Sequence, residues 1–211
     1  MFSKITRKNL DVFLRKYSSK RKVLDIGSGG SAYDRYFPNR ITVDIDPERK
    51  PEIVADIHKM PFGDGEFEMV LCTEVLEHTL DPKVAIREIK RVLKKDGLLI
   101  LSTRFVYPLH DIPNDYWRFT YFGMKKLFED WEVVELVPET KTFSAMGALL
   151  QRVGFQTKLR FNYLSKLFIY LLAKVFEKLD FLILSEYGDI KKKSEASNIM
   201  ATGYYIVVRK K

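Results

Sequence analysis

Along most of the chain, short runs of apolar residues alternate with longer stretches in which apolar residues recur every three or four positions. The short runs are typical of buried strands, and the periodic stretches are typical of amphipathic helices. We expect seven strands, at residues 22–26, 41–45, 53–55, 67–72, 98–103, 131–137 and 203–209. This alternation predicts an α/β fold with a largely parallel sheet.

The clearest predicted helix follows Asp81, which is a good N-cap, and begins with Pro82, which suits the first helical position. Ala85 and Ile89 start its apolar face, and Gly97 is a typical residue at which such a helix ends. This segment is therefore expected to be helical up to Gly97.

A second helix is expected over residues 121–129, and more than sixty residues separate the last two expected strands. This long segment carries a wide apolar stripe at helical spacing between Leu164 and Ile183. Packing against the sheet would cover the stripe. A dimer surface or a membrane-facing lid are the alternatives, because several lysines lie nearby.

We predict a single domain over residues 1–211. Its expected parts are a basic N-terminal helix (1–21), a cofactor-binding core (22–137), a helical insertion (138–201) and a last strand (202–211). No apolar stretch reaches the roughly 18 uninterrupted residues of a membrane span.

The composition is that of a folded protein, with 46% hydrophobic and 30% charged residues among 211. The net charge of +8 is unevenly spread, being +7 over residues 1–22, −7 over 23–140 and +8 over 141–211. Basic ends of this kind favour contact with something anionic, so peripheral membrane contact stays open, as does a homodimer. No aromatic signature of RNA binding accompanies them, and we expect no nucleic-acid partner.

The chain contains one cysteine, Cys72, which excludes an intrachain disulfide and any metal site with two thiolates from one chain. Only three histidines are present and no HExxH pair occurs, so we expect no metal site. The N-terminus has no apolar segment of signal-peptide length. A cytoplasmic location is therefore expected, with membrane-peripheral contact left open.

A glycine-rich turn follows the first expected strand, in KVLDIGSGGSAYDRYF. No Gly-Lys dipeptide occurs in the chain, which excludes a Walker-type phosphate loop. Gly27, Gly29 and Ala32 fit the dinucleotide-binding pattern GxGxxG/A, and Asp44, at the end of the second strand, is placed to bind ribose hydroxyls. These residues alone leave open a dinucleotide or another nucleoside cofactor.

Five motifs that follow one another along the chain distinguish between these two kinds of cofactor: VLDIGSGG, ITVDIDP, VADIHKMPF, FEMVLCTEVLEH and REIKRVLKKDGLLILST. Together with DYWRFT they resemble the class I S-adenosylmethionine-dependent methyltransferases of the type 11 group, over about residues 20–137. The resemblance implies a Rossmann-like class I methyltransferase fold, with a mostly parallel seven-stranded sheet and a helical insertion before the last strand. It also implies S-adenosyl-L-methionine as cofactor.

The resemblance also assigns roles to residues at the strand ends. The cofactor-binding residues that it implies are Asp25, Gly27, Ser28 and Gly29 at the methionine part, Asp44 at the ribose, Ile45, Asp56 and Ile57 at the adenine, and Cys72 and Thr73 at the amino-acid end. The loop reads GSGGS where the family has GxGxG, so Gly30 and Ser31 receive no role.

The acceptor is expected at the loop after the fifth motif, residues 106–120, because ligands of such sheets lie outside the strand ends. His110 is the candidate base, since imidazole exchanges a proton near neutral pH, and Asp111 is the second choice. The candidate substrate-binding residues are His78, Tyr116, Trp117 and Arg118. The structural alternative is that the aromatic residues anchor the loop and that Arg118 pairs with an acid.

The sequence thus predicts a methyltransferase that acts on an unidentified acceptor, expected to be a small molecule, a sugar or a lipid-linked glycan. The enzyme alternative is a nicotinamide-dependent oxidoreductase, which the glycine pattern permits and which the later motifs make less favoured. The non-enzymatic alternative is a membrane-surface adaptor that keeps the fold.

Overall fold

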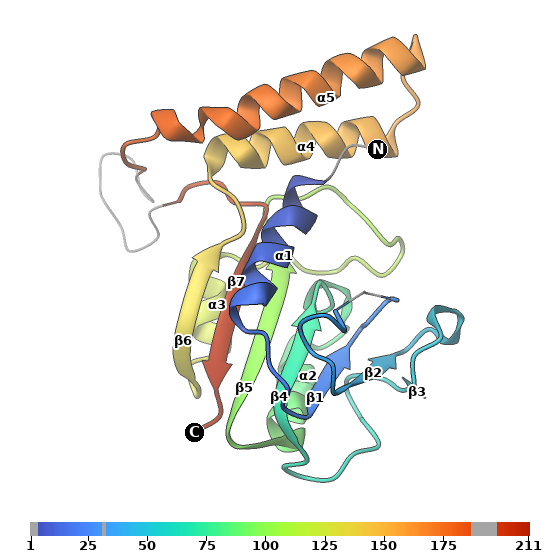
Figure 1. Ribbon diagram of the computed structural model, residues 1–211, viewed down its shortest axis with the longest axis vertical. Coiled ribbons are helices and arrows are strands. Elements are labelled where there is room, and N and C mark those ends of the chain that lie inside the picture. Colours follow the sequence, from blue (N-terminus) through green and yellow to red (C-terminus); the bar gives the residue numbers. More distant parts are fainter. Residues whose placement is uncertain (1–3, 31–32, 187–197) are drawn as a thin grey trace. The chain divides into compact units, whose positions relative to one another are not determined.

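The computed structural model of the chain describes residues 4–30, 33–186 and 198–211 (Figure 1). It divides into two compact units. The sheet unit comprises residues 14–104, 109–137 and 204–211, and the helical unit comprises residues 1–13, 105–108 and 138–203. That the whole chain acts as one domain stays a prediction.

The sheet has seven strands in the order β3-β2-β1-β4-β5-β7-β6, which confirms the predicted fold class. Strands β3, β2, β1, β4 and β5 pair in parallel. The strands are β1 (Val23–Ile26), β2 (Arg40–Asp44), β3 (Ile53–Val54), β4 (Phe67–Thr73), β5 (Leu93–Arg104), β6 (Glu132–Pro138) and β7 (Gly203–Arg209).

Strand β7 runs opposite to β5, as the arrows in Figure 1 show. At one end, the Asp96 amide donates to the Lys210 carbonyl (3.1 Å), and at the other the Phe105 amide donates to the Thr202 carbonyl (2.9 Å). The end of β7 therefore lies beside the start of β5, and the start of β7 lies beside the end of β5. This is the antiparallel arrangement. One reversed strand in an otherwise parallel sheet agrees with the prediction.

Helix α2 (Pro82–Val92) begins as predicted, because the Asp81 carboxylate accepts from the Lys83 amide (2.9 Å) and the Val84 amide (3.1 Å). Such a cap contributes about 1 kcal/mol. The predicted end at Gly97 is wrong, since the helix stops at Val92.

The segment predicted to end that helix instead begins β5. Leu93 pairs with Phe67 of β4, and the Gly97 carbonyl accepts from the Lys210 amide at 3.0 Å. Sheet pairing on both sides thus takes the backbone groups that the last helical turn would have used.

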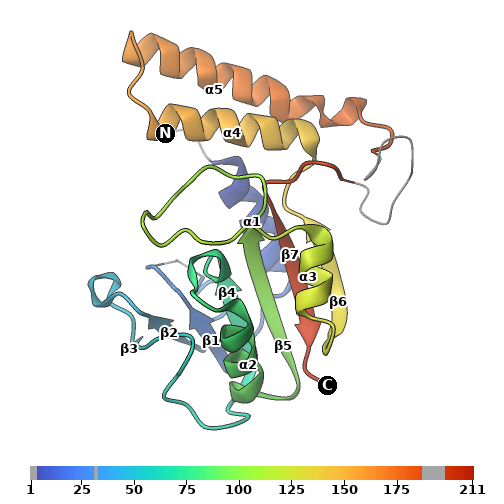
Figure 2. The same cartoon turned by 180° about the vertical axis from the view of Figure 1, so that it is seen from behind.

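Helices α2 and α3 (Tyr121–Leu127) lie on the same face of the sheet (Figure 2). The Thr120 side chain caps α3 by accepting from the Gly123 amide at 3.0 Å. The buried Ile89 of α2, Met124 of α3 and the nearby Trp131 join one hydrophobic core with the apolar side chains of the strands. This core fixes the strand ends at which the candidate site lies.

The helical unit is built on α4 (Thr142–Gln156) and α5 (Asn162–Leu179), which lie side by side in Figures 1 and 2. A Cβ added at Gly147 would lie 2.7 Å from the Ala173 carbonyl oxygen, so the lack of a side chain permits close approach of the helices. These helices form the insertion predicted before the last strand, whose residues 187–197 lie outside the described residues.

Two further observations concern the ends of the chain and its helices. Helix α1 (Ile5–Lys16) lies within the N-terminal segment predicted to be helical over residues 1–21. Among the residues that the structure describes, no helix has the length and apolarity that crossing a membrane requires.

Candidate functional site

A cavity of about 500 Å³ opens within the sheet unit, at the carboxyl ends of β1, β2 and β4. Ligands of parallel α/β sheets bind at this edge, because the loops that leave the strands surround a crevice there. The lining comes from the turn after β1, the residues after β2 and β3, the segment 74–80 after β4, and residues 111–116 of the loop after β5.

Gly27 forms the floor of this cavity at the turn after β1. Its φ of +66° is a left-handed conformation, and its amide donates to the Val43 carbonyl at 2.7 Å. A Cβ at this position would lie 2.2 Å from Cγ2 of Val75, which also lines the cavity. Glycine is therefore required both by the backbone conformation and by the space available.

Asp44, at the end of β2, is buried and lines the cavity. Its Oδ2 accepts from the Gly29 amide and its Oδ1 from the Asp46 amide, both at 3.0 Å. These bonds hold the carboxylate rigidly against the glycine turn. Each oxygen keeps a further lone pair that can accept a ligand hydroxyl.

The other predicted nucleoside contacts follow β2 and β3. Ile45, Asp56 and Ile57 all line the cavity, and the side chain of Ile45 is mostly exposed. Burial opposes ionisation of Asp56, but hydrogen bonds from the His58 backbone and ring keep its pKa below the usual value. Asp56 Oδ1 lies 2.6 Å from His58 Nδ1.

Asp25 lies in β1 and is completely buried, but it is not part of the cavity lining. Its Oδ2 forms an ion pair with Arg40, and its Oδ1 is buried without a hydrogen-bond partner among the described residues. Burial raises the pKa of Asp25 to about 6, although the charge of Arg40 opposes this rise. The carboxylate therefore carries an acceptor position that no described residue uses.

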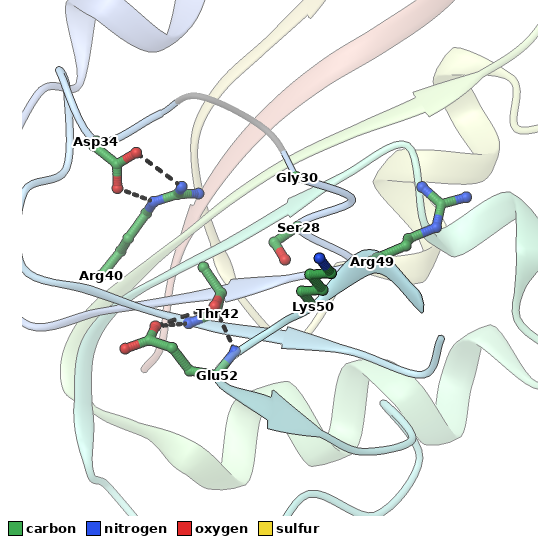
Figure 3. A pocket seen from close by; sticks show the side chains of 8 residues that line it. All are labelled: Ser28, Gly30, Asp34, Arg40, Thr42, Arg49, Lys50 and Glu52. Carbon is green, nitrogen blue, oxygen red and sulfur yellow. Dashed lines mark hydrogen bonds and ion pairs between the residues drawn. The ribbon is translucent and has the colours of Figure 1, made fainter. Parts of the chain in front are cut away.

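Ser28 lines a second cavity of about 430 Å³ (Figure 3). Gly30 also lines this second cavity, with Arg40, Lys50 and Glu52, while Arg49 borders both. Gly29 contributes its amide to Asp44 and lines neither cavity. Ser31 and Ala32 lie outside the described residues.

Cys72 and Thr73, at the end of β4, are buried and line neither cavity. Burial raises the pKa of the Cys72 thiol, with Glu77 and Asp25 adding to the effect. A thiol in this environment stays protonated, which disfavours a role as a nucleophile. The Thr73 hydroxyl lies 3.4 Å from the Tyr33 hydroxyl.

The loop after β5 brings part of the predicted acceptor-binding set to the cavity. Asp111 and Tyr116 line the cavity together with His78, which follows β4. Trp117 does not line it, and its Nε1 donates to the Thr79 carbonyl at 2.8 Å. Arg118 donates to both oxygens of Asp115, at 2.6 and 2.7 Å, as in the structural alternative that the sequence left open.

His110 is half-buried beside the cavity, with its ring edge-on to that of His78 at 4.7 Å between centroids. Burial lowers the pKa of His110, and the nearby Asp115 carboxylate opposes this decrease. Asp115 is itself fixed by Arg118, whose hydrogen bonds hold the pKa of the Asp115 carboxyl well below its usual range. The lowered pKa favours the neutral form of His110.

Several residues that build the site are absent from the set predicted from the sequence. Glu74, Val75 and Asn114 line the cavity, and Glu77 lies behind His78 in the 3-10 turn Leu76–His78. Burial raises the pKa of Glu77 to about 7, which the charge of Arg104 opposes. The motif EVLEH contains both glutamates, but nothing in its spacing indicates which of them faces the cavity.

Comparison with known proteins yields one family match, in which residues 24–101 fit the model of the family described as "Methyltransferase domain". A ubiquinone biosynthesis O-methyltransferase of Pseudomonas aeruginosa is 33% identical over 102 residues, which cover 39% of this chain and 44% of that protein. The chain spans about half the length of the curated relatives it matches.

Solved structures resemble the fold over nearly the whole chain. The [4+2]-cyclase SpnF aligns with a TM-score of 0.60 at 15% identity, covering 97% of this chain and 81% of the cyclase. Coclaurine N-methyltransferase bound to N-methylheliamine and SAH aligns with a TM-score of 0.56 at 17% identity, covering 97% of this chain and 72% of that enzyme. These likenesses confirm the class of fold that the motifs predicted.

Proposed function

We propose that this chain, whose residues 24–101 belong to the type 11 group of class I methyltransferases, is an enzyme that transfers a methyl group from S-adenosyl-L-methionine to an acceptor. The observation that carries the proposal is the charge of the cavity at the strand ends. Its lining holds five carboxylates against one guanidinium: Asp44, Asp46, Asp56, Glu74 and Asp111 against Arg49.

An acidic lining suits a cofactor that carries a positive sulfonium and no phosphate. A dinucleotide would bring a pyrophosphate with two negative charges into the same lining. The one lining arginine, Arg49, has its Nε 3.5 Å from Asp46, so its charge is partly balanced within the site. The lining therefore favours the methyl donor over the nicotinamide alternative.

The residues present fit this cofactor. Asp44 would accept the ribose hydroxyls, and Ile45 and Ile57 would contact the adenine with Asp56 at its edge.

When bound, the cofactor supplies a methyl group on a sulfur that leaves readily because of its positive charge. The contribution of this chain is to hold the acceptor in line, and alignment of reactants can lower a barrier by roughly 7 to 11 kcal/mol. His78, Asp111, Asn114 and Tyr116 form the side of the cavity nearest the loop after β5. These residues would bind the acceptor there.

We infer that the acceptor is a small molecule, a sugar or a lipid-linked glycan that presents an oxygen atom. Tyr116 is 45% exposed and Trp117 is 43% exposed, and the Trp117 ring is fixed by its bond to Thr79, so two aromatic surfaces are available for stacking beside the polar lining. Similarity to an O-methyltransferase of ubiquinone biosynthesis supports an oxygen acceptor.

Titration calorimetry with S-adenosylmethionine and S-adenosylhomocysteine tests the proposal. We expect saturable one-to-one binding, which Asp44→Ala weakens by about 1.5 to 3 kcal/mol because hydrogen bonds to a charged group are lost. Asp64→Ala is the matched control, since Asp64 is exposed and lies outside both cavities. Binding of reduced nicotinamide dinucleotide but of neither sulfur compound would overturn the proposal.

We further propose that α5 rests on an anionic membrane surface. Its exposed side carries an apolar stripe at spacings of four, three and four residues: Leu164 (67% exposed), Phe168 (66%), Leu171 (52%) and Val175 (52%). Lys174 and Lys178 are exposed beside the stripe, and the acidic Glu177 of α5 pairs with Lys8. An apolar face flanked by lysines is typical of helices that lie in a lipid interface.

Charge also decides between a membrane and a second copy of the chain as the occupant of this face. In a two-fold dimer through α5 the lysines of both copies would approach each other, whereas anionic lipid head groups complement them. A membrane-bound enzyme of this kind would meet a lipid-linked acceptor at the surface where it resides.

Vesicle flotation tests the membrane proposal. We expect the protein to float with vesicles that contain phosphatidylglycerol and to stay unbound with pure phosphatidylcholine. Phe168→Glu should abolish flotation, while Phe122→Glu is the control, since Phe122 is an exposed phenylalanine (57%) of the sheet unit. Absence of flotation with both vesicles, or equal flotation of Phe168→Glu, would contradict it, as would self-association through α5 in sedimentation.

A further inference from the structure

We propose that Glu77, His78 and His110 bind a divalent transition-metal ion beside the cavity. Each residue offers one ligand atom, and these atoms all lie within 4.8 Å of one another. A metal ion with bonds of about 2.0 to 2.2 Å holds its ligands somewhat closer than this, so small side-chain rotations would complete the site. His78 lines the cavity, which places the ion at its wall.

The hydrogen bonding of His78 prepares it as a ligand. Its Nδ1 lies 2.6 Å from the carbonyl oxygen of Asn114. A carbonyl oxygen only accepts, so Nδ1 carries the proton and Nε2 keeps its lone pair. Metal-binding histidines typically donate their second ring nitrogen to a carbonyl or carboxylate in this manner, which fixes the tautomer and the orientation of the ring.

His110 is positioned by a carboxylate. Its Nδ1 lies 3.4 Å from Oδ2 of Asp115, and its backbone amide donates to the same oxygen at 3.0 Å. Arg118 holds Asp115 through both of its oxygens. A small rotation of the ring would let Nδ1 donate to this fixed carboxylate, which is the usual support of a metal-binding histidine.

Glu77 supplies the independent observation that points to a ligand. The residue is completely buried, and its Oε2 accepts from the Thr103 hydroxyl at 3.0 Å. Its Oε1 is buried and has no hydrogen-bond partner among the residues that the structure describes. Leaving a buried carboxylate oxygen without a partner is costly, and a cation at this position would remove that cost.

The backbone joins the two segments that carry these ligands. The Tyr116 and Trp117 amides both donate to the Glu77 carbonyl, at 3.0 and 3.1 Å. The loop after β5 is therefore held against the turn that follows β4. The three ligands come from two rigidly connected segments, as a preorganised metal site requires.

Two imidazoles and one carboxylate form a donor set that suits Mn²⁺, Fe²⁺, Co²⁺, Ni²⁺ or Zn²⁺ better than the all-oxygen preference of Ca²⁺. Three protein ligands also leave coordination positions open, as in catalytic sites. Asp111 lies next to the site, with its Oδ2 at 3.8 Å from His78 Nε2.

The role of the ion rests on the proposed function. An acceptor hydroxyl bound at an open position would have its pKa lowered, as metal-bound water does. Its O–H bond breaks, the proton passes to solvent, and the electron pair stays on the oxygen that is bound to the ion. The acceptor would then present an activated oxygen within the cavity.

Calorimetric titration of tag-free, chelator-treated protein with Mn²⁺, Co²⁺, Zn²⁺ or Mg²⁺ alone tests the site. We expect one ion per chain, with a transition metal bound more tightly than Mg²⁺, and a visible absorption spectrum on Co²⁺ binding. Loss of a residue that hydrogen-bonds to a metal ligand costs about 10- to 100-fold in metal affinity. His78→Asn and Glu77→Gln change the ligands themselves, so each should lose at least about 100-fold in metal affinity. His58→Asn, which changes the one histidine outside the cluster, should bind like the unaltered protein.

Parallel titration with S-adenosylhomocysteine separates this inference from the proposed function. Failure of the unaltered protein to bind any of these ions at millimolar concentration, while S-adenosylhomocysteine binds, would overturn the metal site and leave the methyltransferase proposal standing. Binding of a metal ion without binding of S-adenosylhomocysteine would overturn the methyltransferase proposal and leave the metal site standing. Unchanged metal affinity in His78→Asn also overturns the site, and a native melting transition of that variant shows that it is folded.

Discussion

Asp25→Asn should gain stability relative to the unaltered protein as the pH rises from about 4 to 7. Asp25 is completely buried, and its pKa is raised from an ordinary value of 3.8 to about 6, mainly by burial and against the charge of Arg40. A shift of about two units corresponds to roughly 3 kcal/mol between the two protonation states. In the variant, Arg40 keeps its ion pair with Asp34, at 2.9 Å.

The direction of the pH dependence follows from the raised pKa. Between about pH 4 and pH 6 the folded protein holds a proton on Asp25 that the unfolded chain has released, so the stability that this proton provides is lost as the pH rises through 6. Asparagine does not ionise. The unfolding free energy of Asp25→Asn, relative to the unaltered protein, should therefore increase by roughly 2 to 3 kcal/mol between about pH 4 and pH 7.

Urea denaturation followed by circular dichroism at a series of pH values measures this difference. Taking the difference between two proteins cancels the titration of distant groups. Asp64→Asn, at an exposed position, should show a nearly constant difference over the same range. A constant difference for Asp25→Asn as well, or one that decreases as the pH rises, would refute the reasoning.

Three further outcomes are expected. Gly27→Ala should destabilise the fold by roughly 1 to 3 kcal/mol and weaken cofactor binding, measured by thermal unfolding and calorimetry, because its Cβ meets Val75 and its φ is positive. Cys72 should resist alkylation in the folded protein and react once urea unfolds it, as mass spectrometry would show, because burial raises its pKa. Trp117→Phe should cost about 1 kcal/mol of stability in urea denaturation, since the bond to the Thr79 carbonyl is lost.

The sequence was most informative for the sheet. Buried parallel strands have apolar side chains on both faces, so β1 and β4 appear as short, mainly apolar runs that are readily recognised. The error at residues 93–97 has a different origin. The helical pattern there is genuine, but Leu93 pairs with β4 and the Asp96 and Gly97 backbone pairs with β7, whose position no local pattern reveals.

For the cavity, the sequence predicted which strand ends meet but not where every side chain points. Asp44, Ile45, Asp56 and Ile57 line the cavity because they end or follow parallel strands whose carboxyl ends converge. Asp25 precedes the turn by two residues and points into the sheet unit toward Arg40 instead. The side chains of a strand alternate between its two sides, and this alternation alone does not say which side Asp25 faces.

Neither the apolar pattern of the strands nor the convergence of their ends predicts the cluster of Glu77, His78 and His110. Its two segments are separated in sequence by the whole of α2 and β5, and neither segment contains a metal-binding spacing by itself. They meet because two amides of the loop after β5 bond to one carbonyl of the turn after β4. Backbone pairing between irregular segments leaves no periodic pattern in side chains. If the ion binds, the signal to search for in related sequences is therefore a glutamate–histidine pair after the fourth strand together with a second histidine in the loop after the fifth.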